Sequence, residues 1–184
     1  MPIHRLTIRR KHAPKFGFTI IELMMAIAIM AILVGIGAPS LRDFVIRNRI
    51  SSQASDLVGD LQLARSESNR RGLRVAVCKA NSSLSGCTTG ADWSSGWIVY
   101  IDSNRDALYT NGEEILRVHQ ALPTNITMAV TPGSTPAGDR TYYRPTGPAD
   151  ADHTFTVCQT GYSGRVVTLL ASGRTSVAAT AAVC

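Results

Sequence analysis

The sequence has few residues of the kinds that build metal sites or catalytic centres. Its four cysteines and four histidines are scattered, and no two cysteines have a CxxC spacing, which argues against a zinc site. A triad could be assembled from Ser163, His153 and Asp152, but nothing in their spacing supports one. We therefore expect no metal, no cofactor and no catalytic residues, and a protein that is not an enzyme.

Acidic residues are absent from the first 17 positions, which hold five of the 19 basic residues. The formal charge of the whole chain is +6. Beyond position 17, however, 14 basic residues stand against 13 acidic ones, a net charge of +1. The basic character comes mainly from one short stretch, so it is poor support for a nucleic-acid partner.

Charge is almost absent from residues 18–38, where Glu22 is the only charged residue. About 20 apolar residues are enough to cross a bilayer as a helix. A cleaved secretory signal would be shorter, would lack the carboxylate and would place Pro39 beside the cut. An ordinary transmembrane helix leaves Glu22 unexplained, because a carboxylate at the centre of a span costs roughly 2.5 kcal/mol or more.

The start of the apolar run carries a family resemblance that explains this glutamate. Gly17-Phe18-Thr19-Ile20-Ile21-Glu22-Leu23 resembles the processing site of type IV prepilins and type II secretion pseudopilins. The resemblance implies that a membrane prepilin peptidase cuts between Gly17 and Phe18 and that the new N-terminus is methylated. Glu22 is then expected to pair with the N-terminal ammonium of a neighbouring subunit, since the two charges neutralise each other in low dielectric. The alternative is an interfacial glutamate that snorkels to water.

A helical pattern continues beyond Pro39, where we expect a kink or local melting. Apolar residues then recur at spacings of four and three, which indicates one buried helix face: Ile50, Ala54, Leu57, Leu61 and Ala64. The opposite, solvated face is expected to hold Arg47, Arg49, Gln53, Asp56 and Asp60. Arg70-Arg71-Gly72 is expected to end the helix, with cations in its last turn and a glycine after it.

After Gly72 the pattern changes to the alternation of β-strands, separated by clusters of turn residues. Strands are expected at 73–78, 97–101, 114–118, 126–130, 141–143, 154–158, 166–170 and 175–178. The predicted fold class is α+β: one long N-terminal helix packed on an antiparallel, β-rich, pilin-like globular head. The predicted divisions are a cleaved leader at 1–17, a transmembrane assembly helix at 18–39, its amphipathic continuation at 40–72, and the head at 73–184.

Three features of the head allow more than one interpretation. Four cysteines in an exported domain suggest two disulfides with three possible pairings, of which the local ones, Cys78–Cys87 and Cys158–Cys184, are favoured. Residues 102–113 have oxygen ligands spaced as in a calcium loop, but the glycine of that loop is missing, so a polar hairpin turn is preferred. Trp93 and Trp97 are expected to be core or turn anchors.

The later sequence resembles the FimT/GspH group of minor pilins and pseudopilins. The matching segments are Leu63-Ala64-Arg65-Ser66-Glu67, Arg71-Gly72, Trp93 with Gly96-Trp97, Asp102-Ser103-Asn104 and Glu114-Ile115-Leu116-Arg117. The cysteine pairs look more like those of the pilus-type members. The resemblance implies a minor pilin that helps to initiate or cap a type IV pilus, with other major and minor pilins and the prepilin peptidase/methylase as partners. It also implies a single-pass inner-membrane protein with a periplasmic head, extracellular once it is part of the pilus.

Two other functions remain open at this point, a type II secretion pseudopilin H and a pilus subunit that binds double-stranded DNA for uptake. DNA-binding members of the group have a Gly-Arg-x-Arg segment near the C-terminus. Here Gly173-Arg174-Thr175-Ser176 matches it, except that Ser176 replaces the second arginine, and Arg165 lies one predicted strand earlier. Two arginines form a weak phosphate-binding site, and both could equally be solvated strand-end residues.

Overall fold

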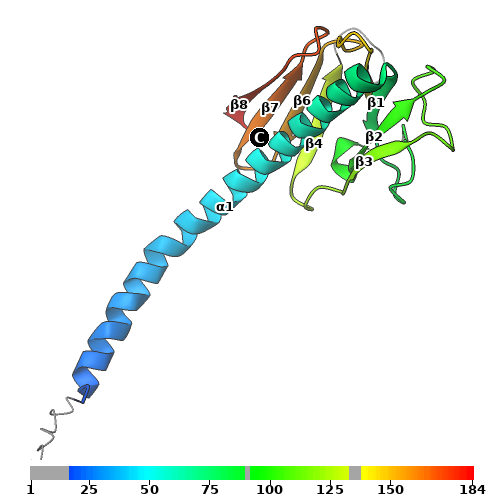
Figure 1. The fold of residues 1–184 in the computed structure, drawn as a ribbon. Helices are drawn as coiled ribbons and strands as arrows, with labels where there is room; N and C mark the ends of the chain where they lie inside the picture. The colour runs from blue at the N-terminus through cyan, green and yellow to red at the C-terminus, as the bar shows by residue number, and fades with distance from the viewer. Residues whose placement is uncertain (1–16, 90–91, 133–137) are drawn as a thin grey trace, which may run out of the picture. The chain divides into compact units, whose positions relative to one another are not determined.

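The computed structural model describes residues 17–89, 92–132 and 138–184, so residues 1–16 of the predicted leader lie outside the described part. The chain forms two compact units, Met1–Arg42 and Asp43–Cys184, which we describe separately. One helix, one 3-10 turn and eight strands make up the described structure (Figure 1).

Helix α1, Ile20–Arg71, is the single long helix that the sequence predicts. It ends where expected, with Arg70 and Arg71 in the last turn, and the N–H of Gly72 donates to Ser68 O at 3.0 Å. Gly72 has a φ of +67°, the left-handed conformation that glycine adopts at little cost. The helix runs without a break through position 39, so the local melting expected there is absent, while a kink at Pro39 stays a prediction.

In the unit Asp43–Cys184, two antiparallel four-stranded sheets pack with the second part of α1 (Figure 1). The first sheet has the order β3-β2-β1-β5, and its strands are β1 Arg74–Lys79, β2 Trp97–Asp102, β3 Ile115–His119 and β5 Arg140–Tyr143. The second has the order β4-β6-β7-β8, with β4 Thr127–Pro132, β6 His153–Cys158, β7 Ser163–Leu169 and β8 Thr175–Val183. The 3-10 turn η1 spans Trp93–Ser95.

All eight predicted strands are present, and the α+β fold class is confirmed. The largest difference is β8, which continues to Val183 rather than ending near position 178. Alanine has low strand propensity, so the alanine-rich end of β8 gave no strand signal. Pairing with β7, in which Val183 lies opposite Ser163, stabilises the strand conformation here despite the low propensity of the sequence.

The main core forms where the apolar face of α1 meets both sheets. All five predicted core residues of the helix are 0% or 1% exposed. Trp93 and Trp97 are buried in the same core, which confirms them as anchors. Every residue of β2 is buried, because a second cluster of Ala76, Cys78, Ala80, Ile98 and Tyr100 covers the other face of the first sheet.

Candidate assembly segment and charged sites of the head

The predicted processing residues Gly17 and Phe18 lie just before α1, and the predicted assembly residue Glu22 lies in its first turn. The N–H of Thr19 donates to Glu22 Oε2 at 3.5 Å, and the N–H of Glu22 donates to Thr19 Oγ1 at 3.3 Å. Since α1 begins at Ile20, this is a capping box, in which two free N–H groups of the first helical turn are satisfied reciprocally. This arrangement was not predicted from the sequence, although the Thr-x-x-Glu spacing is its signature. Gly17 and Phe18 are exposed, Phe18 at 82%.

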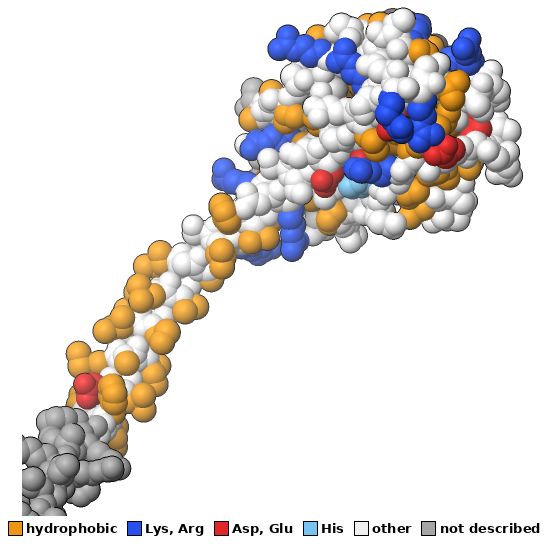
Figure 2. Space-filling model, viewed as in Figure 1, with side chains coloured by type: hydrophobic (Ala, Val, Ile, Leu, Met, Phe, Trp, Pro, Cys, Tyr) orange, Lys and Arg blue, Asp and Glu red, His pale blue; other side chains and the backbone are white. Residues whose placement is uncertain are grey.

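The part of α1 from Ile20 to Leu41 has no buried side chain among those that the structure describes. Its large hydrophobic residues, from Ile20 to Leu41, are between 56% and 80% exposed, and Figure 2 shows hydrophobic side chains along this part of the helix. α1 is long and apolar enough to cross a membrane, with a stretch of mean hydropathy 2.5. In water such a surface would be strongly unfavourable. The segment therefore requires a partner, either lipid or the apolar helices of neighbouring subunits.

Asp60 contradicts the prediction that it lies on the solvated face of α1, since it is 1% exposed. Trp97 Nε1 donates to Asp60 Oδ2 at 2.8 Å, and Arg117 Nη1 donates to Asp60 Oδ1 at 3.0 Å. Position 60 lies beside Leu57 and Leu61 on the helix and therefore belongs to the buried face. The prediction was wrong because it followed the polar character of aspartate rather than its position on the helix. The burial is tolerated because the carboxylate has a cation and a donor as partners.

His119 completes this cluster by stacking on Trp97, with ring centroids 3.8 Å apart and planes 2° from parallel. Its Nδ1 lies 3.7 Å from Asp60 Oδ2. Burial lowers the pKa of His119 and outweighs the opposite effect of the Asp60 carboxylate. The cluster joins α1 to strands β2 and β3 and is structural in character.

Gly173 lies in the tight turn between β7 and β8, where the sequence suggested a DNA contact. Its φ is +80°, and a side chain there would come within 2.2 Å of Gly147 O, so only glycine fits. Arg65 of α1 holds this turn by donating from Nη1 to Gly173 O at 3.0 Å and from Nη2 to Ser172 O at 3.4 Å. The sequence singled out Arg65 only as part of a family motif, and the structure gives it this local role.

The structure does not bring Arg165 and Arg174 together. Arg165 in β7 lies opposite Ala179 of β8, whereas Arg174 immediately precedes β8. Position 174 and position 179, which faces Arg165, are five residues apart along the strand, which corresponds to about 17 Å. Arg174 is exposed, and Arg165 is half-buried with Nη1 donating to Gly164 O at 3.4 Å. The two arginines therefore do not form one compact phosphate site.

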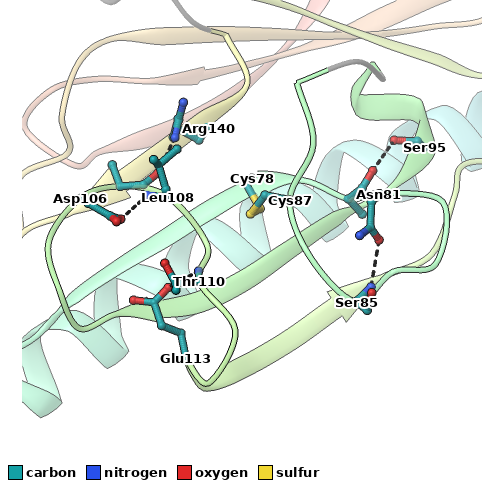
Figure 3. The surroundings of a disulfide bond; sticks show 12 residues. Cys78, Asn81, Ser85, Cys87, Ser95, Asp106, Leu108, Thr110, Glu113 and Arg140 are labelled. Carbon is teal, nitrogen blue, oxygen red and sulfur yellow. Dashed lines mark hydrogen bonds between the residues drawn. A yellow bond between two sulfur atoms is a disulfide. The ribbon is translucent and has the colours of Figure 1, made fainter.

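Both disulfides of the structure are the local pairings, Cys78–Cys87 and Cys158–Cys184. The first fastens the loop after β1, and Figure 3 shows it between that loop and the loop that joins β2 to β3. The second fastens the end of β8 to β6. A side chain at Gly164 would come within 2.9 Å of the sulfurs of both Cys158 and Cys184, so this glycine makes room for the bond.

The loop at 102–113 uses its carboxylates to bind its own main chain (Figure 3). Asp106 Oδ1 accepts from the N–H of Leu108 at 2.7 Å, and Glu113 Oε2 accepts from the N–H of Thr110 at 2.9 Å. Asp102 accepts from Ala107 N–H at 3.0 Å and also pairs with Arg74. These contacts are those of the polar turn that the sequence analysis preferred over a calcium loop.

The components of the hypothetical triad lie apart. His153 lies opposite Leu169, at the end of β7 remote from Ser163, and Asp152 accepts from Ala171 N–H at 2.6 Å. His153 instead contacts Asp150, with Nε2 3.4 Å from Oδ1. Burial alone would raise the pKa of Asp150, but hydrogen bonds from His153 and Thr141 outweigh it and lower that pKa.

Comparisons with known proteins give consistent results. The family model described as type II transport protein GspH matches residues 53–173, and the one described as the prokaryotic N-terminal methylation motif matches residues 13–38. No curated protein matches the chain.

Among solved structures, the chain is similar to the type IV minor pilin FimU of Pseudomonas aeruginosa, with 22% identity and a TM-score of 0.55 over 76% of this chain and 98% of that chain. It is also similar to the minor pseudopilin EpsH of the type II secretion system of Vibrio cholerae, with 10% identity and a TM-score of 0.53 over 74% of this chain and 98% of that chain. At these identities the likeness shows the fold alone.

Proposed function

Since the chain belongs to the type II transport protein GspH family, we propose that it is a minor pilin of a type IV pilus, a structural subunit that helps to initiate or cap assembly. The peptidase cuts between Gly17 and Phe18, and residues 18–39 anchor the subunit in the inner membrane. The head, together with the amphipathic helix at 40–72, then lies in the periplasm until the subunit enters the filament.

The observation that carries the proposal is the exposed apolar part of α1, most of which lies within the match to the methylation motif at residues 13–38. Leu23, Ile27, Met30 and Val34 recur at spacings of three and four, so they form one stripe along the helix. Ala26 and Ala31 lie beside this stripe and let a second helix approach closely. A helix of this kind suits both a bilayer and a bundle of like helices, and assembly moves it from the first to the second.

Glu22 provides the test, because its two possible roles respond differently to substitution. As a cap it needs only a side-chain acceptor, which glutamine also offers. As the partner of a neighbour's N-terminal ammonium it needs its negative charge. We expect Glu22→Gln to leave processing at Gly17 intact and to reduce incorporation of the full-length chain into the pilus fraction of its native host at least tenfold.

The matched control is Glu67→Gln, which removes a half-buried carboxylate near the end of α1 that pairs with Arg70 and Arg71, and which should leave incorporation unchanged. Incorporation is measured as the ratio of the chain in sheared pili to the chain in membranes. Normal incorporation of the Glu22→Gln variant would show that the charge of Glu22 is not needed for assembly.

A type II secretion pseudopilin is the second candidate, and the description of the matching family as type II transport protein favours it. The presence of two disulfides in the head, which resembles pilus-type members, is our reason for placing the pilus first. Deletion of the gene distinguishes the two functions. Loss of surface pili with normal protein secretion supports the pilin, and the reverse supports the pseudopilin.

A DNA-uptake subunit has less support, because Arg165 in β7 lies far along the β7–β8 pair from Arg174, which precedes β8. The conformation of Gly173 is also explained by the tight turn between these strands. Its prediction is binding of double-stranded DNA that weakens with salt and is lost in the Arg165→Ala, Arg174→Ala double variant.

A further inference from the structure

Three of the four edge strands in the two sheets have their outer sides covered or interrupted. The N–H of Met128 in β4 donates to Ser94 Oγ of η1 at 2.8 Å. In β5, Tyr142 O accepts from the N–H of Asp150 at 3.0 Å. Strand β3 has only five residues, carries Arg117, and pairs with β2 through an irregular register. These are devices that keep an edge from pairing with another chain.

Strand β8 is the fourth edge and has none of these devices in the described structure. It is nine residues long, and it contains no charged residue, proline or glycine. Residues 176–179 are all exposed, and Val177 is 46% exposed although it points to the same side as the buried Val167 opposite it. A long, uncharged edge with both faces accessible is suited to accept a further strand.

The hairpin between β7 and β8 fixes which main-chain groups of β8 face outward. The N–H of Leu170 donates to Arg174 O at 2.9 Å, so positions 170 and 174 form a hydrogen-bonded pair. Such pairs alternate in an antiparallel ladder, so Ser176 bonds to β7, while the N–H and C=O groups of Thr175 and Val177 point away from it. No main-chain partner for these outward groups exists among the residues that the structure describes.

We propose that β8 is a docking edge, where the head of another pilin subunit adds an extended strand through the outward main-chain groups of Thr175 and Val177. The proposal rests on the function proposed above. An outward row of N–H and C=O groups is matched by another peptide backbone. The docked strand is neutral or acidic, since residues 153–184 hold Arg165 and Arg174 and no acid. The small side chains of Ser176, Ala178 and Ala179 allow a second backbone to approach.

Two substitutions at one position test the docking edge. Val177→Pro removes an outward N–H and leaves the bonds between β8 and β7 in place, because proline lacks only that donor. Val177→Thr keeps the N–H and the branched shape and serves as the matched control. Each is made in the full-length chain in its native host, with a photo-crosslinking amino acid at the exposed position Ala179.

We expect a crosslink to another pilin subunit, identified by mass spectrometry, in the wild-type and Val177→Thr chains. The crosslink should fall at least fivefold in Val177→Pro, at equal chain level and equal thermal stability of the head. An undiminished crosslink in Val177→Pro, the absence of any crosslink, or a crosslink only to a second copy or to a protein other than a pilin would overturn the proposal.

If the proline variant folds poorly, hydrogen exchange of the wild-type chain tests the docking edge instead. The amide of Val177 should exchange at least a hundredfold more slowly in the pilus-associated chain than in detergent micelles, whereas the amide of Ser176 should be protected in both. Equal exchange of the Val177 amide in the two states contradicts the docking edge. Incorporation of the chain into pili without this protection refutes the docking edge alone, whereas failure to enter pili refutes the proposed function.

Discussion

The two parts of α1 use the same residue types in opposite ways. Leu33, in the first part, is 66% exposed, whereas Leu61, in the second, is fully buried between the helix and the sheets. Both are leucines in one uninterrupted helix. The second part therefore obtains its stability from contacts within the chain, whereas we expect the first to depend on lipid or on other subunits.

The largest effect should come from making one substitution in both parts. Leu61→Ala leaves a cavity in the head and should lower its free energy of unfolding by about 3 kcal/mol. Leu33→Ala should change it by less than about 0.5 kcal/mol, because it removes no contact within the head. The measurement is denaturant unfolding of the full chain in detergent micelles, followed by fluorescence of Trp93 and Trp97. Similar losses of unfolding free energy in the two variants would contradict this difference between the two parts of α1.

A smaller difference in unfolding free energy is expected between alanine variants of Asp60 and Asp56, two aspartates on neighbouring turns of α1. Asp60→Ala leaves the indole N–H of Trp97 buried without an acceptor and removes the partner of Arg117, so we expect a loss of about 2 kcal/mol. Asp56 is exposed, and Asp56→Ala should have an effect near zero. The same unfolding measurement applies, and equal losses would contradict the buried position of Asp60.

The smallest effect is a dependence on pH that comes from Asp150. Its pKa in the folded head lies below the ordinary value of 3.8, so the stabilisation is present above that pH and is lost as pH falls through the lower, folded pKa. Asp150→Asn should make the stability of the head less sensitive to pH below about pH 4, while Asp56→Asn should not. Unfolding curves recorded between about pH 2 and 6 check this, and identical pH profiles for wild type and Asp150→Asn would count against it.

The fold was largely predictable because its elements have strong local signals. The buried stripe of α1, from Ile50 to Ala64, and the eight strands follow from periodicity alone. The features that could not be predicted depend on contacts between residues far apart in the sequence. Asp60 is polar, yet Trp97 and Arg117, 37 and 57 positions away, make it a core residue. Arg65 acts on a turn more than 100 residues later.

The candidate sites were predictable to different degrees for the same reason. The processing motif at Gly17 and Phe18 is a contiguous sequence, so it could be recognised without a structure. The spacing of Arg165 and Arg174 depends on the register of β7 and β8, which no local pattern specifies. The outer side of β8 is also a property of sheet order, because only the arrangement β4-β6-β7-β8 makes that strand an edge.

The mass of the native chain shows whether the first part of α1 serves as an assembly helix, since this role requires that the segment be kept and that the leader be removed. Mass spectrometry of the protein from its native membranes should find a chain that begins at Phe18 with a methylated N-terminus. A chain that still begins at Met1, or one that begins after Ala38 and lacks the apolar segment, would contradict this role.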